Sequence, residues 1–499
     1  MDDHRTTAQP STPLPSSSRS VASPKTPFDW LQGNLFFGGV RNSRNSTDGN
    51  TNTSGGESTS SGVKSNTDED SALIDKCTDA SALLIGVSQY LHALISQKQL
   101  QETEARSIDD GGVSTPSTLS EVQQSSVETD ATTATDSSIL TAISDKIAVR
   151  LARLRFLLYD ERRVTSQQPQ YLIESKKLKP VVAEATVAAI AGIQAQNIIP
   201  TLFENMSSLP FESRKHVAAI FNYLLICGLE GIDAPIYSTA MTKFVSYVEA
   251  NYEQIMTQIV QGHDSSRHGI TPDIALHFGS MYRSCTRHPN LYQQLVGTRD
   301  RAARFVYPFL DEYVHMANFE ISSDAMESLR AAFAANPDRT VSNVDEKNAE
   351  QWNRSCISDI AAEFLNRDYE ALWDDRFTPK LLSDTANYMS RRVALQILST
   401  VLLTRSNYSV MIRYVASRTN LIVVMHLLRD TSPHITLDAF HVFKVFVANP
   451  NKPPEIVKIL HDNKSKLCAY LTTLHQEKEE SDAQFRDEKA LIISTIDAQ

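Results

Sequence analysis

The sequence predicts an all-α protein, an armadillo/HEAT-like right-handed helical solenoid preceded by a disordered N-terminal extension. Three observations carry this prediction. From about residue 138, apolar residues recur at three- and four-residue steps almost without pause, prolines interrupt these stripes, and a pair of one small and one large residue repeats along the chain. The two-residue alternation of strands bounded by hairpin turns is missing, which argues against a sheet.

The first part of the chain is rich in hydroxyl residues. Residues 1–70 contain 22 Ser or Thr, and such a segment cannot bury enough apolar surface to offset its ordering entropy, so we expect it to be disordered. An apolar island from Phe28 to Phe37 has two interpretations, a docking motif that folds on a partner or chain that packs loosely on its own body. Residues 71–101 predict a helix, and residues 102–137 a disordered insertion. Residues 71–499 are thus expected to form one helical-repeat scaffold.

The remaining sequence predicts successive helices. Ile143, Ile147, Leu151 and Leu154 begin one apolar stripe, and similar stripes follow to the end of the chain. Proline is welcome in the first turn of a helix and disruptive within it, so prolines mark helix starts and joints. The breaks that we identify are Pro180, Pro200, Pro210, Pro235, Pro272, Pro289, Pro379, Pro433 and Pro453-Pro454.

A repeated residue pair indicates how the helices pack. A small Ala is followed four positions later by a large residue, in the pairs Ala325–Leu329, Ala394–Leu398 and Ala439–Phe443, with Ala275–Gly279 as a degenerate copy. The spacing of 45 residues between the last two copies falls in the armadillo/HEAT range. An Ala lets a neighbouring helix approach closely, so the pairs predict stacked units that share a continuous core.

Composition argues against nucleic acid and membranes as partners and against secretion. The net charge is −11, and residues 1–138 hold 18 acidic and 9 basic residues, so the rest is nearly neutral. A near-neutral body favours neither nucleic acid nor an anionic membrane surface. Without a long apolar run or an apolar signal core, we expect neither membrane insertion nor secretion, and a cytoplasmic location. Five widely spaced cysteines without a C-x-x-C indicate reduced thiols and no zinc ribbon.

The sequence carries none of the common motifs of catalysis or of metal binding. Phosphate-binding loops of the GxxxxGK[ST] and GxGxxG types, HExxH and an EF-hand calcium loop are all missing, so we expect no catalytic residues, no cofactor and no metal. His263 and His268 stand in a polar loop without a periodic partner. An enzyme with an unrecognised helical active site stays as an alternative, since missing motifs do not exclude catalysis.

The C-terminal hundred residues resemble one family. The stretch LRDTSPHITLDAFHVFKVFVANPNKPPEIVKIL, Leu428 to Leu460, is similar to the signature of the calcium-binding protein 39 family of kinase scaffolds, and QFRDEKALIISTI, Gln484 to Ile496, resembles its final helix. Shorter matches upstream include FESRKHVAAIFN at 211–222 and NYMSRRVALQIL at 387–398. The resemblance extends over residues 139–499, with 71–101 as a first helix.

The resemblance implies a function. Family members are non-enzymatic armadillo-like scaffolds that bind a pseudokinase or a Sterile-20-type kinase and hold its fold in the active-like conformation. They act in polarity and morphogenesis pathways, including one with a Dbf-type kinase downstream. Part of the interaction places a Trp-Glu-Phe-like tail in a hydrophobic pocket near the C-terminal repeats, and part lays a concave groove against the kinase domain.

The tail pocket is carried over onto two residues. Met425 matches the family's pocket Met, and Lys466 resembles a lysine on the pocket rim. A second rim lysine of the family falls at Asp462, where Lys464 is a substitute. From the residues alone, Met425 is expected to be a core side chain more often than a pocket residue, since it stands among Leu421, Val424 and Leu428.

The kinase groove is carried over onto four residues. Arg405 and Tyr408 match an Arg and an aromatic of the kinase-facing surface, and Arg392 and Phe319 match two further groove residues. Arg and aromatic side chains are enriched in interface hot spots, which agrees with these roles. The plainer alternatives are solvated charges for the arginines and a helix joint for Phe319. A general peptide adaptor is the competing function, although such grooves use ladders of Asn and Trp and this chain has three Trp.

Overall fold

The computed structural model describes Ile74 and residues 77–109, 126–158, 180–227, 235–264, 266–267, 269–335 and 349–498. The chain divides into two compact units, and the division falls between Lys444 and Val445, within a helix. We call the described residues through Lys444 the N-terminal unit and those from Val445 the C-terminal unit, and describe each by itself. The expected extension 1–70, with its apolar island, lies outside the described residues.

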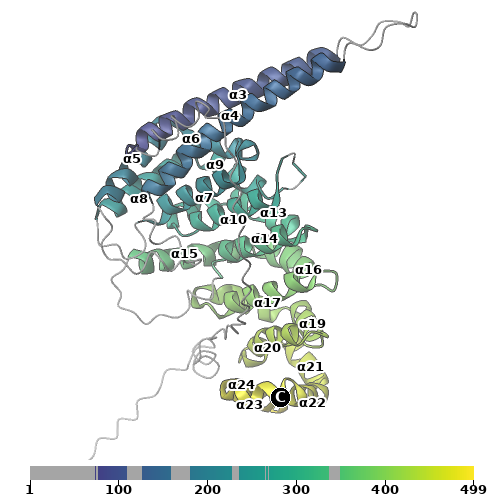
Figure 1. Ribbon diagram of the computed structural model, residues 1–499. Coiled ribbons are helices and arrows are strands. Elements are labelled where there is room, and N and C mark those ends of the chain that lie inside the picture. The colour runs from purple at the N-terminus through teal and green to yellow at the C-terminus, as the bar shows by residue number, and fades with distance from the viewer. Residues whose placement is uncertain are drawn as a thin grey trace, which may run out of the picture. The chain divides into compact units, whose positions relative to one another are not determined.

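Every regular element among the described residues is helical, so the predicted fold class is confirmed (Figure 1). The helices of the first half are α3 (Ala80–Asp109), α4 (Ser126–Leu158), α5 (Pro180–Gln196), α6 (Ile198–Glu204), η3 (Met206–Ser208), α7 (Phe211–Ile226), α8 (Pro235–Ala250), α9 (Tyr252–Gln261), α10 (Pro272–Cys285), α11 (Pro289–Val296), α12 (Arg299–Phe305), α13 (Tyr307–Asp311) and η4 (Tyr313–His315). Then follow α14 (Phe319–Ala332), α15 (Ala349–Arg367), the π-helix η6 (Glu370–Phe377), α16 (Thr378–Leu381), α17 (Tyr388–Leu403), η7 (Arg405–Asn407), α18 (Tyr408–Ala416), α19 (Arg418–Leu427) and α20 (Pro433–Ala448).

The first two helices differ from their predicted bounds. The helix predicted over 71–101 is interrupted in the structure, since Ile74 is helical, residues 77–79 are not, and α3 begins at Ala80. The Asp79 side chain caps α3 by accepting a hydrogen bond from the Ser81 backbone N at 2.9 Å. Helices α3 and α4 also continue into the segment 102–137 that the sequence predicts to be disordered, as far as Asp109 and from Ser126. Adding a turn to a formed helix costs less than starting one, so each helix extends into sequence of low propensity. Residues 110–125 lie outside the described residues.

Prolines mark helix starts as predicted. Helices α5, α8, α10, α11 and α20 begin at Pro180, Pro235, Pro272, Pro289 and Pro433. At this position the missing N–H is one that a helix leaves unpaired in any case.

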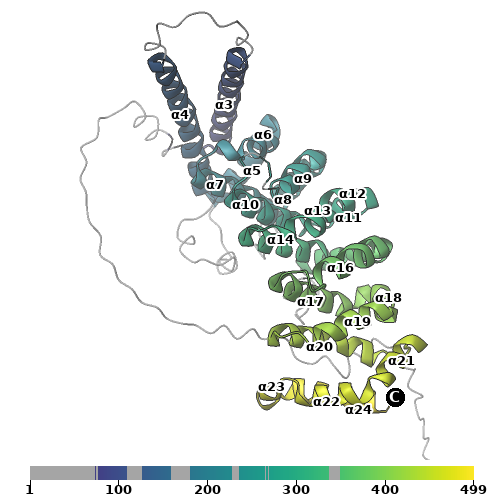
Figure 2. The same cartoon turned by 90° about the vertical axis from the view of Figure 1, so that its right-hand side faces the viewer.

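The repeated pairs lie in one helix of each successive layer of the N-terminal unit. Ala275, Ala325, Ala394 and Ala439 are fully buried in α10, α14, α17 and α20, so the predicted repeat is confirmed. We call α7, α10, α14, α17 and α20 as far as Lys444 the ladder helices. Figure 2 shows α7, α10, α14 and α17 one after another along one side of the unit, with α12 and α18 on the other.

A buried charge cluster explains the degenerate copy of the repeat. Asp324 Oδ1 of α14 accepts a hydrogen bond from Arg283 Nη2 of α10 at 2.7 Å. The Nε2 atom of buried His263 lies 3.5 Å from Asp324 Oδ2. A Cβ on Gly279 would stand 1.7 Å from the same Oδ2. A large residue at this position would therefore occupy the space that the carboxylate needs.

The C-terminal unit holds the end of α20 and four further helices, α21 (Pro454–Asp462), α22 (Lys464–Thr473), α23 (Gln476–Ser481) and α24 (Ala483–Asp497). Lys489 of α24 is buried, and its Nζ donates to the Thr472 O at 3.1 Å and the Leu474 O at 2.7 Å. Glu479 neutralises its charge at 2.9 Å. The lysine thus satisfies carbonyls that the end of α22 leaves without partners.

Two further expectations from the sequence concern the state of the cysteines and membrane insertion. All five cysteines are free thiols, and burial raises the pKa of Cys227 and Cys285 to about 12. Among the described helices, none alone has the length and apolarity needed to cross a membrane, although α5 and α6, bent by 76°, meet those criteria as a pair.

We expect Gly279→Ala to lower the free energy of unfolding by about 1–3 kcal/mol, since the added methyl group displaces the Asp324 carboxylate. Urea unfolding measures the change. The control is Ser284→Ala in the same helix, which removes only a hydroxyl bonded to the backbone of its own helix. Equal stability of both variants would contradict the close approach of α10 and α14.

We expect Asp324→Asn to destabilise the protein at pH 7 by about 1–3 kcal/mol, because it removes a charge-assisted hydrogen bond. Burial opposes ionisation of Asp324, but His263 and Arg283 outweigh it and lower the pKa of the carboxyl. This stabilisation is present above the unfolded pKa of about 3.9 and is lost as the pH falls through the lower folded value. Urea unfolding of both proteins from pH 7 to pH 3 should show their stabilities converging in acid, and a constant difference would argue against the ion pair.

Candidate functional site

The ladder helices carry polar bridges from each layer to the next. The bridges are Asn222 Nδ2 to Ser280 Oγ at 3.0 Å, Arg283 Nη1 to Ser328 Oγ at 3.0 Å, Arg330 Nη2 to Gln396 Oε1 at 3.2 Å and Gln396 Nε2 to Asp438 Oδ2 at 3.3 Å. Gly279 and Arg283 of α10 lie against Asp324 and Ser328 of α14 in the same order, so these two helices run parallel. The contacts of Val314 and Arg330 with Ser390 and Gln396 keep the same order, so α14 and α17 run parallel as well. Residues such as Ile274 and Phe278 occupy the buried side of the same helices. We call the surface that carries the bridges the ladder face.

Two of the predicted groove residues lie near the N-terminal ends of ladder helices. Phe319 is the first residue of α14, and its side chain is 62% exposed. The preceding Asn318 caps the helix by accepting from the Glu320 backbone N at 2.9 Å. Arg392 lies in the second turn of α17, whose start is capped in the same way by Asn387. Since α14 and α17 are parallel neighbours, Phe319 and Arg392 belong to the same end of the ladder face.

The other two groove residues lie beyond the opposite end of α17. Arg405 begins η7 and Tyr408 begins α18, and both side chains are exposed. Neither side chain makes a hydrogen bond or an ion pair within the part of the chain that the structure describes. From Arg392 to the end of α17 at Leu403 is roughly 16 Å at 1.5 Å per residue. The four residues therefore form two separate pairs and not one compact patch.

Met425 lies in α19 of the N-terminal unit. It is half-buried, whereas Leu421, Val424 and Leu428 around it are fully buried. The Ser417 side chain caps α19 by accepting from the Asn420 backbone N at 3.3 Å. Part of Met425 is therefore accessible to another molecule, and its assignment to a tail pocket stays a prediction.

Lys466 lies in α22 of the C-terminal unit and is exposed, without an ion pair among the described residues. Asp462, at the position of the family's second rim lysine, is exposed and lies 3.7 Å from His461 Nδ1. Lys464, the suggested substitute, contacts the Asp497 carboxylate at 3.4 Å. A substitute role for Lys464 would thus require it to leave this partner.

Two exposed aromatic residues were missed by the sequence analysis. Tyr388 and Phe211 are the first residues of α17 and α7, and both are exposed on ladder helices. Like Phe319, each directly follows the capping position, held by Asn387 and Pro210. An aromatic residue directly after a capping Asn or Pro is a signal that could have found them.

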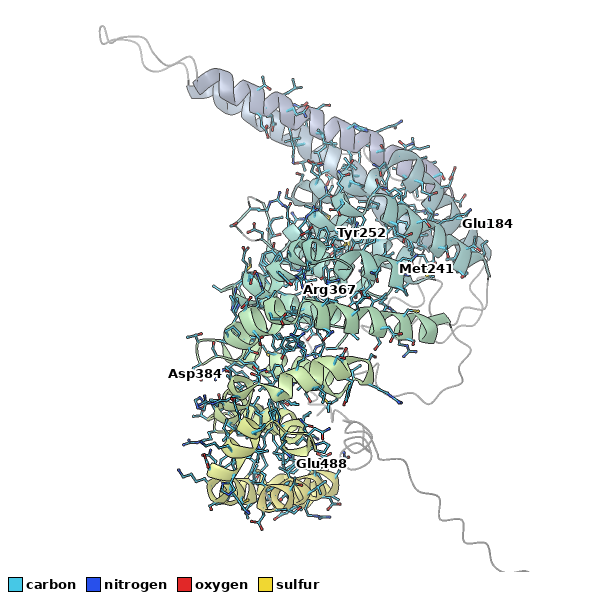
Figure 3. All side chains as sticks on the ribbon, turned by 180° about the vertical axis from the view of Figure 1, so that it is seen from behind. Glu184, Met241, Tyr252, Arg367, Asp384 and Glu488 are labelled. Atoms are coloured by element: carbon cyan, nitrogen blue, oxygen red, sulfur yellow. The ribbon has the colours of Figure 1, made fainter. Side chains whose placement is uncertain are left out.

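A cavity of about 350 Å³ lies between α12, α13 and η6. On its wall Asp368 is almost fully buried between Arg299 Nε at 3.3 Å and Arg367 Nη2 at 2.8 Å (Arg367 is labelled in Figure 3). Burial raises the pKa of nearby Tyr307 to about 12, so this group is a donor and not a base at neutral pH. The buried carboxylate is paired with two arginines, which favours a structural joint beside the π-helix over an acid–base site.

Among the described residues, no three His, Cys, Asp or Glu side chains gather in a way that could hold a metal ion. Buried His263, singled out in the sequence, faces Asp324 and stacks on Tyr313 with ring centroids 5.6 Å apart, while His268 lies outside the described residues.

Comparison with known proteins agrees with the resemblance of the signature stretch. The family model described as Mo25-like matches residues 119–354 and 356–498. Calcium-binding protein 39-like of Homo sapiens is 31% identical over 315 residues, which cover 63% of this chain and 79% of that protein. The Mo25-like protein of Schizosaccharomyces pombe is 32% identical over 305 residues, 61% of this chain and 78% of that protein.

A third relative has a developmental name. Conidiophore development protein hymA of Emericella nidulans is 24% identical over 374 residues, which cover 72% of this chain and 85% of that protein. Among solved structures, a designed armadillo repeat protein is 10% identical with a TM-score of 0.27, covering 59% of this chain and 99% of that one. A score this low does not bear on the fold, which rests on the helices described above.

Proposed function

Because this chain belongs to the Mo25-like family, we propose that it is a non-catalytic scaffold that binds a protein kinase or pseudokinase and stabilises its active conformation. The partner is of the Sterile-20 type, and the pathway is one of polarity or morphogenesis with a Dbf-type kinase downstream. The name of the hymA relative, which concerns conidiophore development, supports a morphogenetic setting.

The observation that carries the proposal is the accessibility of the predicted kinase-facing side chains. Phe319, Arg405 and Tyr408 expose large aromatic or guanidinium groups at helix starts. The Asn318 cap fixes the backbone at Phe319, and the Asn407 side chain, which donates to the Val401 O at 3.0 Å, fixes it between Arg405 and Tyr408. Exposed rings and arginines on a rigid support are typical of interface hot spots. Their separation into two pairs favours a partner large enough to span α17, such as a folded kinase domain, over a short peptide.

Activation of a kinase in this way needs no bond chemistry. A scaffold shifts the balance between two kinase conformations only by its difference in affinity for them. Binding the active conformation about 100-fold more tightly contributes about 2.7 kcal/mol to that equilibrium. Two separated contact pairs support such a difference, since both fit at once only when the kinase presents the matching spacing.

The peptide adaptor is the less favoured function. Grooves that bind extended peptides use exposed Trp and Asn side chains. Trp373 is fully buried and contacts Phe377 with ring centroids 4.9 Å apart, so it serves the core.

The direct test combines the purified full chain with purified Sterile-20-type kinases and pseudokinases. Binding is measured by calorimetry, and kinase activity by phosphate transfer to a generic substrate. We expect saturable binding of at least one kinase and a rise in its activity. Intrinsic turnover by the chain alone, or no binding to any kinase of this type, would contradict the proposal.

We expect the double variant Arg405→Ala with Tyr408→Ala to need at least about tenfold more protein for half-maximal kinase activation, the loss typical of hot-spot residues. Its melting temperature should stay unchanged, because both side chains are exposed. Arg418→Ala, an exposed arginine at the start of α19, is the control. Unfolding of the double variant would show instead that the two residues are structural.

We expect Met425→Ala to weaken binding of a kinase that ends in an acidic-aromatic tail by about 1–3 kcal/mol. The half-buried thioether can adapt to an aromatic guest, and Ala removes that contact surface. Titration with the tail peptide alone and with the whole kinase measures the loss. His426→Ala, the exposed neighbour in the same helix, should bind as wild type. Unchanged affinity of folded Met425→Ala protein would remove the pocket assignment.

A further inference from the structure

Helix α17 carries two adjacent arginines, and each faces a carboxylate that follows α17 in the chain. Arg391 Nη1 contacts Asp430 Oδ2 at 2.7 Å, a direct charge-assisted hydrogen bond. Arg392 Nε lies 3.6 Å from Asp438 Oδ2, an ion-pair distance without a hydrogen bond. Both pairs join an Arg of α17 to an Asp, but only Arg391 makes a hydrogen bond to its carboxylate.

The Nη groups of Arg392 are the part of its guanidinium that no contact among the described residues uses. Its Nε is buried against α20, yet 36% of the side chain is exposed. Within the described residues its Nη groups donate no hydrogen bond. Because a guanidinium is planar and rigid, fixing Nε on one side sets the direction in which the Nη groups point.

A further hydrogen bond fixes the position of the Asp438 carboxylate. Its side chain is only 18% exposed, and its Oδ2 accepts from Gln396 Nε2 at 3.3 Å. Gln396 Oε1 in turn accepts from Arg330 Nη2 at 3.2 Å. Arg330 is buried in α14, so the contacts continue through α14, α17 and α20. The carboxylate that faces Arg392 therefore has a fixed place on the ladder face.

The charge of Asp438 is unfavourable for the fold. Burial raises the pKa of this carboxyl, and the contacts with Gln396 and Arg392 offset only part of the effect. A neutral side chain of the same shape would be accommodated at least as well in the folded state at neutral pH. The contact of Asp438 with Arg392 is therefore better explained by the placement of the guanidinium than by a gain in stability.

We propose that Asp438 is a positioning residue that fixes the guanidinium of Arg392 so that its Nη groups meet an acceptor on the bound kinase. The inference rests on the proposed function, because it takes Arg392 as a kinase contact. Asp438 acts through Arg392 and touches no partner itself. Gln396 and Arg330 keep the carboxylate in place.

The test measures the binding of a Sterile-20-type kinase domain to the full chain carrying Asp438→Asn, Arg392→Ala or both. We expect about tenfold weaker binding for Arg392→Ala and about three- to tenfold weaker binding for Asp438→Asn. In the Arg392→Ala background, Asp438→Asn should change the affinity by less than about twofold, since its only route of action is gone. The urea midpoint of Asp438→Asn should equal or exceed that of the wild type.

Two comparisons separate positioning from a structural effect. Asp430→Asn removes the carboxylate of the neighbouring pair and should leave kinase binding unchanged. Asp438→Glu restores the charge and should recover part of the affinity that Asp438→Asn loses.

The possible failures are distinct. If the wild-type chain binds no kinase of this type, the proposed function fails. If the wild type binds and Asp438→Asn binds equally well, or weakens binding as much without Arg392 as with it, the positioning role is wrong while the scaffold function stands. A lower urea midpoint together with weaker binding would assign Asp438 to the fold.

Discussion

The N-terminal unit depends on the close approach of parallel helices, none of which can bury its own apolar side alone. Ala275, Ala325 and Ala394 permit that approach, because a methyl group leaves the space that the next helix fills. Between α10 and α14 the space is taken by a carboxylate, and Gly279 stands where the other copies carry a large residue. In each case a small residue leaves room, for the next helix in most layers and for a buried carboxylate between α10 and α14.

Much of the fold follows from local sequence, since helix starts and small residues have local causes. Prolines set the starts of helices such as α10 and α20, and the Ala spacing in the sequence identifies the layers. The start of α3 was misjudged because the cap at Asp79 is weaker as a signal than the apolar stripe before it. The length of α3 and α4 was missed because a helix can propagate through Ser- and Thr-rich sequence that would not start one.

The candidate site was predictable only in part. The family signature pointed to Phe319 and Arg392, and the structure shows both to be accessible. It could not show that Arg405 and Tyr408 lie beyond the far end of α17, because that depends on the length and direction of the helix. The bridge from Gln396 to Asp438 joins residues 42 positions apart, and no pattern within one helix reveals such a partner.

The polar bridges have a mechanical consequence. Each of the four bridges joins one layer to the next, and none among them joins layers further apart. A displacement imposed on one layer is therefore passed on step by step, and the unit should deform elastically through many small changes in spacing. A rigid body fastened at two points of such a stack suppresses those changes between the points, so occupancy itself would stiffen the protein.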